Sequence, residues 1–153
     1  CLYCPMSDDC QARIENRPAD FPGKKPKIAI PIRSTVFLQC IDQEGRVLLD
    51  RRPPTGIWGG LWSFPEIGEK ADLANWLLDN GLMANGDVIE RSQHSHTFSH
   101  FKLDITPLMC PIAAASSRIS DRDDRRWFTI AEALALGLPA PVLKMLNTFT
   151  TKD

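Results

Sequence analysis

The three histidines of the chain fall within one short segment, RSQHSHTFSHFKLDI. Even spacing separates His94, His96 and His100, so an extended strand would place all three on one face. Three imidazoles on one face can bind zinc, and a histidine can also act as a general acid or base. Two observations weaken these interpretations. No nearby Asp, Glu or Cys completes a metal-ligand set convincingly, and the segment lacks the nucleophile or carboxylate partner that acid–base catalysis needs.

Two further interpretations concern the residues Phe98, Ser99 and His100. A serine hydroxyl both donates and accepts, so Ser99 at a hairpin tip suits the reading of a base edge. Phe98 would then anchor the tip in the core or press against a sugar, and His100 would bond a phosphate or buttress the loop. The simpler interpretation is a turn with a structural histidine and a core phenylalanine, and the residues alone favour it.

Cys1, Cys4 and Cys10 form a tight cluster at the start of the chain. In a metal centre several thiolates must converge within about 2.3 Å of each zinc or iron atom. Three ligands are one short of the usual four, so the spacing leaves a metal centre and free surface cysteines both open. The odd total of 5 cysteines and the lack of a secretory signal argue against a disulfide framework and indicate a reducing compartment.

The bulk composition describes an ordinary globular chain. Its 153 residues are 43% hydrophobic with a net charge of -1, which suits one domain with a short appendage. This charge argues against strong sequence-independent binding to nucleic acid. No apolar run of membrane-spanning length occurs, so we expect no membrane partner.

Residues 17–32 are rich in proline and lysine and are predicted to be an extended linker, not a helix. They separate a cysteine-bearing tip, residues 1–16, from a globular part, residues 33–153. A short helix is expected after Cys10. Lys24, Lys25 and Lys27 in the linker are candidates to follow a DNA backbone, and Arg51 and Arg52 are weaker ones.

Within the globular part, strands and helices interleave. Apolar and β-branched patterns predict strands over 34–42, 47–53, 61–66, 87–96, 100–112 and 125–130. Helical spacing predicts helices over 70–82, 129–138 and 139–149, with Gly81 ending the first and Thr129 and Glu132 capping the second. Gly45 is expected in a turn with positive φ. The order predicts an α/β (α+β) domain with a mixed sheet and helices on its faces. Four residues of the segment GIWGGLWSFPE, residues 56–66, are expected in the core: Trp58, Leu61, Trp62 and Phe64.

Three segments, in this order, resemble adenine DNA glycosylases of the MutY type. CLYCPMSDDCQA is similar to the end of that family's iron–sulfur loop, where four cysteines in a Cys-x6-Cys-x2-Cys-x5-Cys pattern hold a [4Fe-4S] cluster. Cys1, Cys4 and Cys10 match the last three. RPPTGIWGGLWSFPE and HTFSHFKLDI resemble matching stretches of the family's C-terminal domain, and the order and spacing fit along the whole chain.

The resemblance implies a Nudix-like α/β/α sandwich over residues 33–153, preceded by a remnant of the cluster loop and an interdomain linker. In the family, adenine mispaired opposite 8-oxoguanine is excised, and a Phe-Ser-His tip contacts the 8-oxoguanine strand. Phe98, Ser99 and His100 match this tip. The implied partners are double-stranded DNA containing 8-oxoguanine:adenine and an N-terminal catalytic domain lying upstream.

The resemblance also sets expectations for the isolated chain. It should be a monomer without glycosylase activity and without a bound cluster, although the full-length protein would carry the [4Fe-4S] group. A bacterial cytoplasmic location, in DNA repair at the nucleoid, is implied as well.

Two other classes of function stay open. A working Nudix hydrolase carries a helix with the pattern Arg-Glu-x-x-Glu-Glu, whose carboxylates bind Mg²⁺ around a pyrophosphate. After LWSFPE this chain offers only Glu66, Glu69 and Asp72, so we expect the fold without the hydrolase chemistry. The other class is a protein-interaction module that uses the tryptophan-rich loop as its contact face.

Overall fold

The computed structural model describes residues 1–21, 23, 29–113 and 124–150, and it divides the chain into two units, Cys1–Ile30 and Pro31–Asp153. The first unit holds helix α1 (Gln11–Ile14), which directly follows Cys10 as predicted, and the 3-10 helix η1 (Pro18–Asp20). The prediction of a wholly extended segment over 17–32 is wrong at η1. Proline is tolerated in a first helical turn, and the Arg17 guanidinium pairs with the Asp20 carboxylate at 2.7 Å. Lys24, Lys25 and Lys27 lie outside the described residues.

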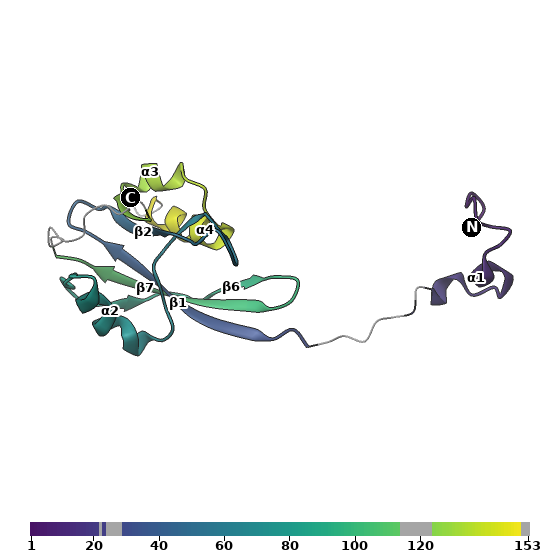
Figure 1. The fold of residues 1–153 in the computed structure, drawn as a ribbon, viewed down its shortest axis with the longest axis horizontal. Coiled ribbons are helices and arrows are strands. Elements are labelled where there is room, and N and C mark those ends of the chain that lie inside the picture. Colours follow the sequence, from purple (N-terminus) through teal and green to yellow (C-terminus); the bar gives the residue numbers. More distant parts are fainter. Residues whose placement is uncertain (22, 24–28, 114–123, 151–153) are drawn as a thin grey trace. The chain divides into compact units, whose positions relative to one another are not determined.

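The second unit is built on one mixed β-sheet (Figure 1). Its strands are β1 (Ile32–Ile41), β2 (Val47–Arg51), β3 (Trp62–Ser63), β4 (Glu66–Ile67), β5 (Ile89–Glu90), β6 (His94–Thr97), β7 (Lys102–Pro111) and β8 (Arg125–Phe128). The main path runs β3-β2-β1-β7-β5, with β4 beside β1, β6 beside β7 and β8 beside β2. β1 and β7 are parallel, and the other pairs are antiparallel. The predicted mixed sheet is confirmed.

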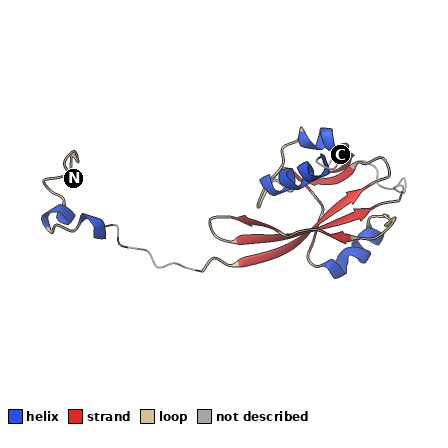
Figure 2. Cartoon of the chain, turned by 180° about the vertical axis from the view of Figure 1, so that it is seen from behind, coloured by secondary structure: helices blue, strands red, loops and turns tan. Residues whose placement is uncertain are grey.

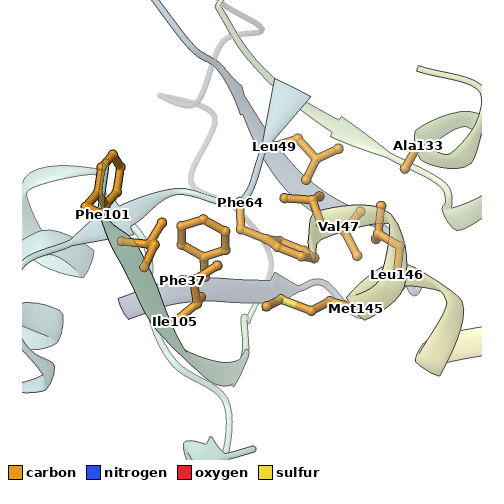
Figure 3. Close-up of a cluster of buried hydrophobic side chains, with 11 residues drawn as sticks. Phe37, Val47, Leu49, Phe64, Phe101, Ile105, Ala133, Met145 and Leu146 are labelled. Carbon is orange, nitrogen blue, oxygen red and sulfur yellow. The ribbon is translucent and has the colours of Figure 1, made fainter. Parts of the chain in front are cut away.

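Helices cover both faces of this sheet (Figure 2). The 3-10 helix η2 (Lys70–Asp72) and α2 (Leu73–Asp79) lie on one face, and α3 (Ile130–Leu134) and α4 (Ala140–Thr150) lie on the other. Because successive strand side chains point to opposite faces, β1 serves both cores. Phe37 joins Phe64 and Met145 on the α4 side (Figure 3), whereas Leu38 joins Leu77 on the α2 side. The α/β/α layering is confirmed.

The predicted strand over 87–96 is wrong as a single element, because it is split into β5 and β6. The pairing register changes between them: Glu90 faces Leu108, whereas His94 faces Ile105. Residues 91–93 therefore lie opposite only two residues, Thr106 and Pro107, which is the arrangement of a β-bulge. Proline has no N–H to give to a ladder, so the interruption falls where Pro107 stands.

Helix α3 is shorter than the predicted 129–138 and ends at Leu134. Beyond it the carbonyl of Gly137 accepts a hydrogen bond from the Trp62 N–H at 3.0 Å, so the chain turns to join the sheet. The predicted capping box is confirmed, since Thr129 and Glu132 bond each other's backbone N–H groups. Gly45 and Gly81 have the expected positive φ, 76° and 64°. In the part of the chain that the structure describes, no helix has the length and apolar character needed to span a membrane.

Candidate nucleic-acid interface

Ser99 and His100 stand at the tip of the hairpin that joins β6 to β7. The last ladder pair is Thr97 with Lys102, and the Phe98 N–H donates to the Phe101 carbonyl at 2.8 Å, which closes the turn. Both tip side chains are exposed. Ser99 Oγ and His100 Nδ1 lie 3.1 Å apart, at hydrogen-bonding distance. The hairpin therefore presents one hydroxyl and one imidazole to solvent.

Aromatic rings pack against the base of this tip. Phe98 stacks on Phe101 with ring centroids 4.6 Å apart and an interplanar angle of 24°. The ring of His100 meets Phe101 edge-on at 4.9 Å, and the Arg33 guanidinium lies over Phe101 at 4.6 Å. Phe101 itself is buried in the core. Because the turn rests on packed rings, Ser99 is preorganised rather than carried on a loose loop.

Trp58, from the glycine-rich loop after β2, packs against the same hairpin. Its ring centroid lies 5.3 Å from that of Phe98 and 5.5 Å from that of His96. Trp58 has a φ of 57°, which is unusual for a residue with a side chain. A Cβ on Gly59 would lie 2.5 Å from the Pro54 carbonyl oxygen, so only glycine allows the loop to fold this tightly. The glycine-rich loop and the β6–β7 hairpin, two segments singled out in the sequence, therefore pack against each other.

The three histidines do not converge. His94 and His96 share one face of β6, as even spacing predicts, and His96 packs edge-on against Phe98 at 4.7 Å. Burial and the charge of Lys144 lower the pKa of His94. His100 lies beyond the turn. Within the described ranges, no group of three His, Cys, Asp or Glu side chains is arranged to hold a metal ion.

Within the hairpin, neighbouring side chains neutralise the charge of Asp104. Ser95 Oγ donates to the Asp104 carboxylate at 2.5 Å, and Lys102 Nζ lies 3.1 Å from the same carboxylate. The hydrogen bond from Ser95, together with Lys102, lowers the pKa of Asp104. Lys102 is therefore already paired, which leaves Arg33 and the tip itself as the groups best placed to meet an anion.

Cys1 and Cys4 are exposed and Cys10 is half-buried. The Cys4 N–H donates to the Cys1 carbonyl at 3.2 Å, and Cys10 precedes the first turn of α1. Three thiols are one short of the four ligands that a [4Fe-4S] cluster takes, and in the described part of the chain they do not gather into a metal-binding group. By itself, this set does not fit the cluster.

The carboxylates that follow β3 have partners within the fold. Glu66 accepts from Thr35 Oγ1 at 2.6 Å and pairs with Arg52 at 2.8 Å. Glu69 and Asp72 bond each other's backbone N–H groups in a capping box at the start of η2. This donor set does not resemble the converging carboxylates of a pyrophosphate-bound Mg²⁺ site.

Arg51 and Arg52, the weaker candidates for DNA contact, line one cavity of about 570 Å³ beside the glycine-rich loop. Arg52 is engaged by Glu66, and Arg51 Nε donates to the Gly60 carbonyl at 3.3 Å. Of the residues expected in the core, Phe64 is fully buried, and Trp58 and Trp62 pack against the core while staying partly exposed.

Sequence reasoning missed two features of this region. It treated Trp58 as a core residue without a functional neighbour, although the flanking glycines signalled an unusual loop. It also missed Gln39, a fully buried polar residue of β1, which interrupts the apolar run from Val36 to Ile41.

The fold described above is that of a known protein family. The family model of the NUDIX domain matches residues 36–148, and the chain belongs to this family. The Nudix-like fold implied by the sequence resemblance is thereby confirmed.

Among curated proteins, the chain is similar to adenine DNA glycosylases of Buchnera aphidicola. It is 28% identical over 149 residues to the protein of subsp. Acyrthosiphon pisum (strain APS), covering 97% of this chain and 42% of the relative. It is 26% identical over 149 residues to the protein of subsp. Schizaphis graminum (strain Sg), covering 97% and 43%. The chain therefore spans less than half the length of these relatives.

Among solved structures, the chain is similar to the C-terminal domain of mouse MUTYH, which was crystallised in complex with human PCNA. The TM-score is 0.62 at 19% identity, covering 76% of this chain and 86% of that chain. The MutT protein from Methanosarcina mazei Go1 gives a TM-score of 0.58 at 15% identity, covering 82% and 100%. At these identities the likeness shows the shared fold.

Proposed function

We propose that this chain is the lesion-recognition part of an adenine DNA glycosylase, and that its hairpin tip reads 8-oxoguanine opposite the mispaired adenine. The similarity to adenine DNA glycosylases over 97% of the chain supports this function. The observation that carries it is the position of Ser99, which is exposed at a tip whose neighbours Phe98 and His100 both lie against the buried Phe101 ring.

The chemistry of Ser99 suits the lesion. 8-Oxoguanine differs from guanine by an added carbonyl oxygen and a new ring N–H on its Hoogsteen edge, where guanine offers only an acceptor. When Ser99 donates its proton to His100 Nδ1, 3.1 Å away, its oxygen lone pairs are left to accept that N–H. Guanine has no donor for the same oxygen, so the contact discriminates between the two bases.

The other tip residues position this contact. Phe98 packs inward against Trp58 and Phe101, so its role is to anchor the tip. His100 orients the Ser99 hydroxyl, and its remaining ring nitrogen is free to meet a phosphate. Arg33, held over Phe101, is a second candidate for a phosphate contact.

In the whole protein, an N-terminal catalytic domain would precede this chain and remove the adenine. Residues 1–16 would complete the cluster loop, with Cys1, Cys4 and Cys10 as three [4Fe-4S] ligands and the fourth cysteine supplied from upstream. Residues 17–32 would connect the cluster loop to the Nudix-like domain at 33–153. The bacterial cytoplasm, at the nucleoid, is where such a protein would meet its DNA.

The test is Ser99→Ala in the full-length glycosylase. Loss of one base-edge contact should reduce the discrimination of 8-oxoguanine:adenine from guanine:adenine duplexes by on the order of 1–3 kcal/mol in binding. Ser95→Ala is the matched control, because it removes the same group from the same hairpin, where the hydroxyl is bonded to Asp104. Equal discrimination by wild-type and Ser99→Ala proteins would contradict the proposal.

Two assays address the enzyme classes directly. The chain alone is expected to release no adenine from duplex DNA, since the proposed catalytic domain lies upstream, and adenine release would overturn this assignment. It is also expected to hydrolyse no oxidised nucleotide in the presence of Mg²⁺, because Glu66, Glu69 and Asp72 already serve structural bonds. Turnover in this second assay would favour the hydrolase.

A further inference from the structure

A cavity of about 470 Å³ lies between the sheet and α4, at the end of β6 that is remote from Ser99. We refer to it as the Gln39 cavity. Sheet residues and α4 residues face each other across it, and the bulge between β5 and β6 forms its rim. Its lining residues are Gln39, Glu90, Arg91, Ser92, His94, Pro107, Met145 and Thr148. The volume falls in the range of about 300–1,000 Å³ that small-molecule sites occupy.

Gln39 is the least expected residue of this cavity. It is 1% exposed, and its side-chain Oε1 has no hydrogen-bond partner among the described residues. Its neighbours on the same face of β1, Phe37 and Ile41, are apolar. Because a buried unpaired acceptor destabilises a fold, such a group is more readily explained when a ligand supplies the donor.

Arg91 brings to the same place a positive charge that no carboxylate of the described residues neutralises. Its Nη2 lies 3.0 Å from the Met109 sulfur, its Nη1 lies 3.4 Å from Thr148 Oγ1, and its guanidinium sits 4.9 Å from the centre of the Phe149 ring. None of these groups is anionic, and no carboxylate of the described residues lies within ion-pair distance of Arg91. Met109 is the ladder partner of Gln39, so the guanidinium is held near the orphan amide.

The other charges around the cavity do not compete for this role. The one carboxylate on the rim, Glu90, is paired with Lys70 at 2.9 Å. His94 adds an imidazole at the mouth. Pro107 and Met145 supply apolar walls. The cavity thus combines a deep acceptor, a fixed cation and apolar walls.

We infer that the Gln39 cavity binds a small organic anion: its phosphate or carboxylate group meets Arg91, its flat body lies against Pro107 and Met145, and an N–H or O–H on that body donates to Gln39 Oε1. A guanidinium recognises either kind of anion by charge-assisted hydrogen bonds. The site is separate from the hairpin tip and needs no DNA.

The first test uses the methionines as reporters in the whole chain, with ¹³C-labelled methyl groups. Met145 lines the Gln39 cavity and Met109 contacts its lining residue Arg91, whereas Met6 and Met83 are exposed elsewhere and serve as internal controls. The probes are thymidine 5′-monophosphate, orotate, benzoate and inorganic phosphate. The first two combine an anion with an N–H donor on a flat ring, benzoate lacks the donor, and inorganic phosphate lacks the ring.

We expect thymidine monophosphate or orotate to shift the methyl signals of Met109 and Met145 saturably, leaving Met6 and Met83 unmoved. The stronger of the two identifies the anion as phosphate or carboxylate. Benzoate and inorganic phosphate should bind roughly tenfold more weakly, since each lacks one set of contacts. No saturable shift with either ring-bearing probe, or equal binding of inorganic phosphate, would overturn the inference.

The second test is Gln39→Leu, with Gln43→Leu in the exposed turn after β1 as the matched control. Gln39→Leu should weaken binding of the preferred probe roughly tenfold and raise the melting temperature of the free protein, because it removes an unpaired buried amide. Unchanged affinity would overturn the inference. If this variant does not fold, the methyl titration of the wild-type chain decides. Neither outcome bears on Ser99, whose test depends on lesion DNA.

Discussion

Trp58 links the glycine-rich loop to the hairpin, and its replacement gives the sharpest test of the local structure. The ring contacts those of Phe37, His96 and Phe98 at centroid distances of 6.5, 5.5 and 5.3 Å. Its backbone has a φ of 57°, in the left-handed region that favours glycine. Two substitutions, Trp58→Ala and Trp58→Gly, remove the same ring contacts. Only Trp58→Gly also relieves the strain of the positive φ.

The expected changes in the free energy of unfolding follow from the lost ring contacts and from the positive φ. Truncation of a fully buried tryptophan to alanine costs about 3–5 kcal/mol, so the partly exposed Trp58 should lose about 2–3 kcal/mol. A left-handed backbone costs an L-residue roughly 1–2 kcal/mol that glycine does not incur. Trp58→Gly should therefore be roughly 1 kcal/mol more stable than Trp58→Ala, even though glycine has the smaller side chain.

Equilibrium urea unfolding measures both variants, with midpoints compared at a common slope. The control pair is Trp62→Ala and Trp62→Gly in β3, where the tryptophan packs edge-on against Phe128 and has no positive φ. There alanine should be at least as stable as glycine, because glycine in a strand loses more backbone entropy. If alanine is also the more stable residue at position 58, the argument from backbone strain is refuted.

Three further predictions concern the loop, the hairpin and the thiols. Gly59→Ala should destabilise the chain by roughly 1–3 kcal/mol in urea unfolding, because the new Cβ would meet the Pro54 carbonyl oxygen at 2.5 Å. Asp104 has a lowered pKa through Ser95 and Lys102, so its stabilising contribution is present above its unfolded pKa of about 3.9 and is lost as the pH falls through its lower folded value; melting of wild type and Asp104→Asn from pH 6 to pH 2 measures it. With a thiol reagent, native protein should show a prompt class of thiols and a second class that reacts only on unfolding. The prompt class is Cys1, Cys4 and Cys10, and the protected class is Cys40 and Cys110.

Each of these predictions has a contrary outcome. Gly68→Ala is the control for the loop, since its Cβ would meet only ordinary contact at 3.5 Å, and equal effects at positions 59 and 68 would contradict the close approach. A constant stability difference between wild type and Asp104→Asn down to pH 2 would mean that the ionised carboxylate contributes nothing. Prompt reaction of all five thiols in folded protein would contradict the burial of β1 and β7.

Much of the fold could be predicted from local patterns. The alternation of Phe101, Leu103 and Ile105 with polar residues gave β7 its buried face, and the strand through Phe37 was equally plain. The strand predicted over 87–96 failed because nothing within that segment marks the register change, which falls opposite Pro107 of the partner strand. A bulge depends on the partner strand, so the periodicity of one segment cannot reveal it.

The candidate site could also be predicted from the sequence only in part. Even spacing correctly placed His94 and His96 on one face of β6. It could not show that Trp58, Phe98 and α4 lie against this face. The resemblance singled out Ser99, whereas the stacking of Phe98 on Phe101 that fixes it could not be read from spacing. Contacts between segments distant in the chain depend on how the sheet and loops pack.

By itself, the sequence determined the order of elements, the turn at Gly45, the cap at Thr129 and the tip that carries Ser99, because each depends on neighbouring residues and on the period of one strand or helix. Only the tertiary structure decided that the glycine-rich loop would support the hairpin and that Gln39 and Arg91 would line one cavity beside α4. The physical reason is that burial and pairing are properties of several segments together. A buried amide or an unneutralised guanidinium becomes visible only when every neighbour that might have satisfied it is in place.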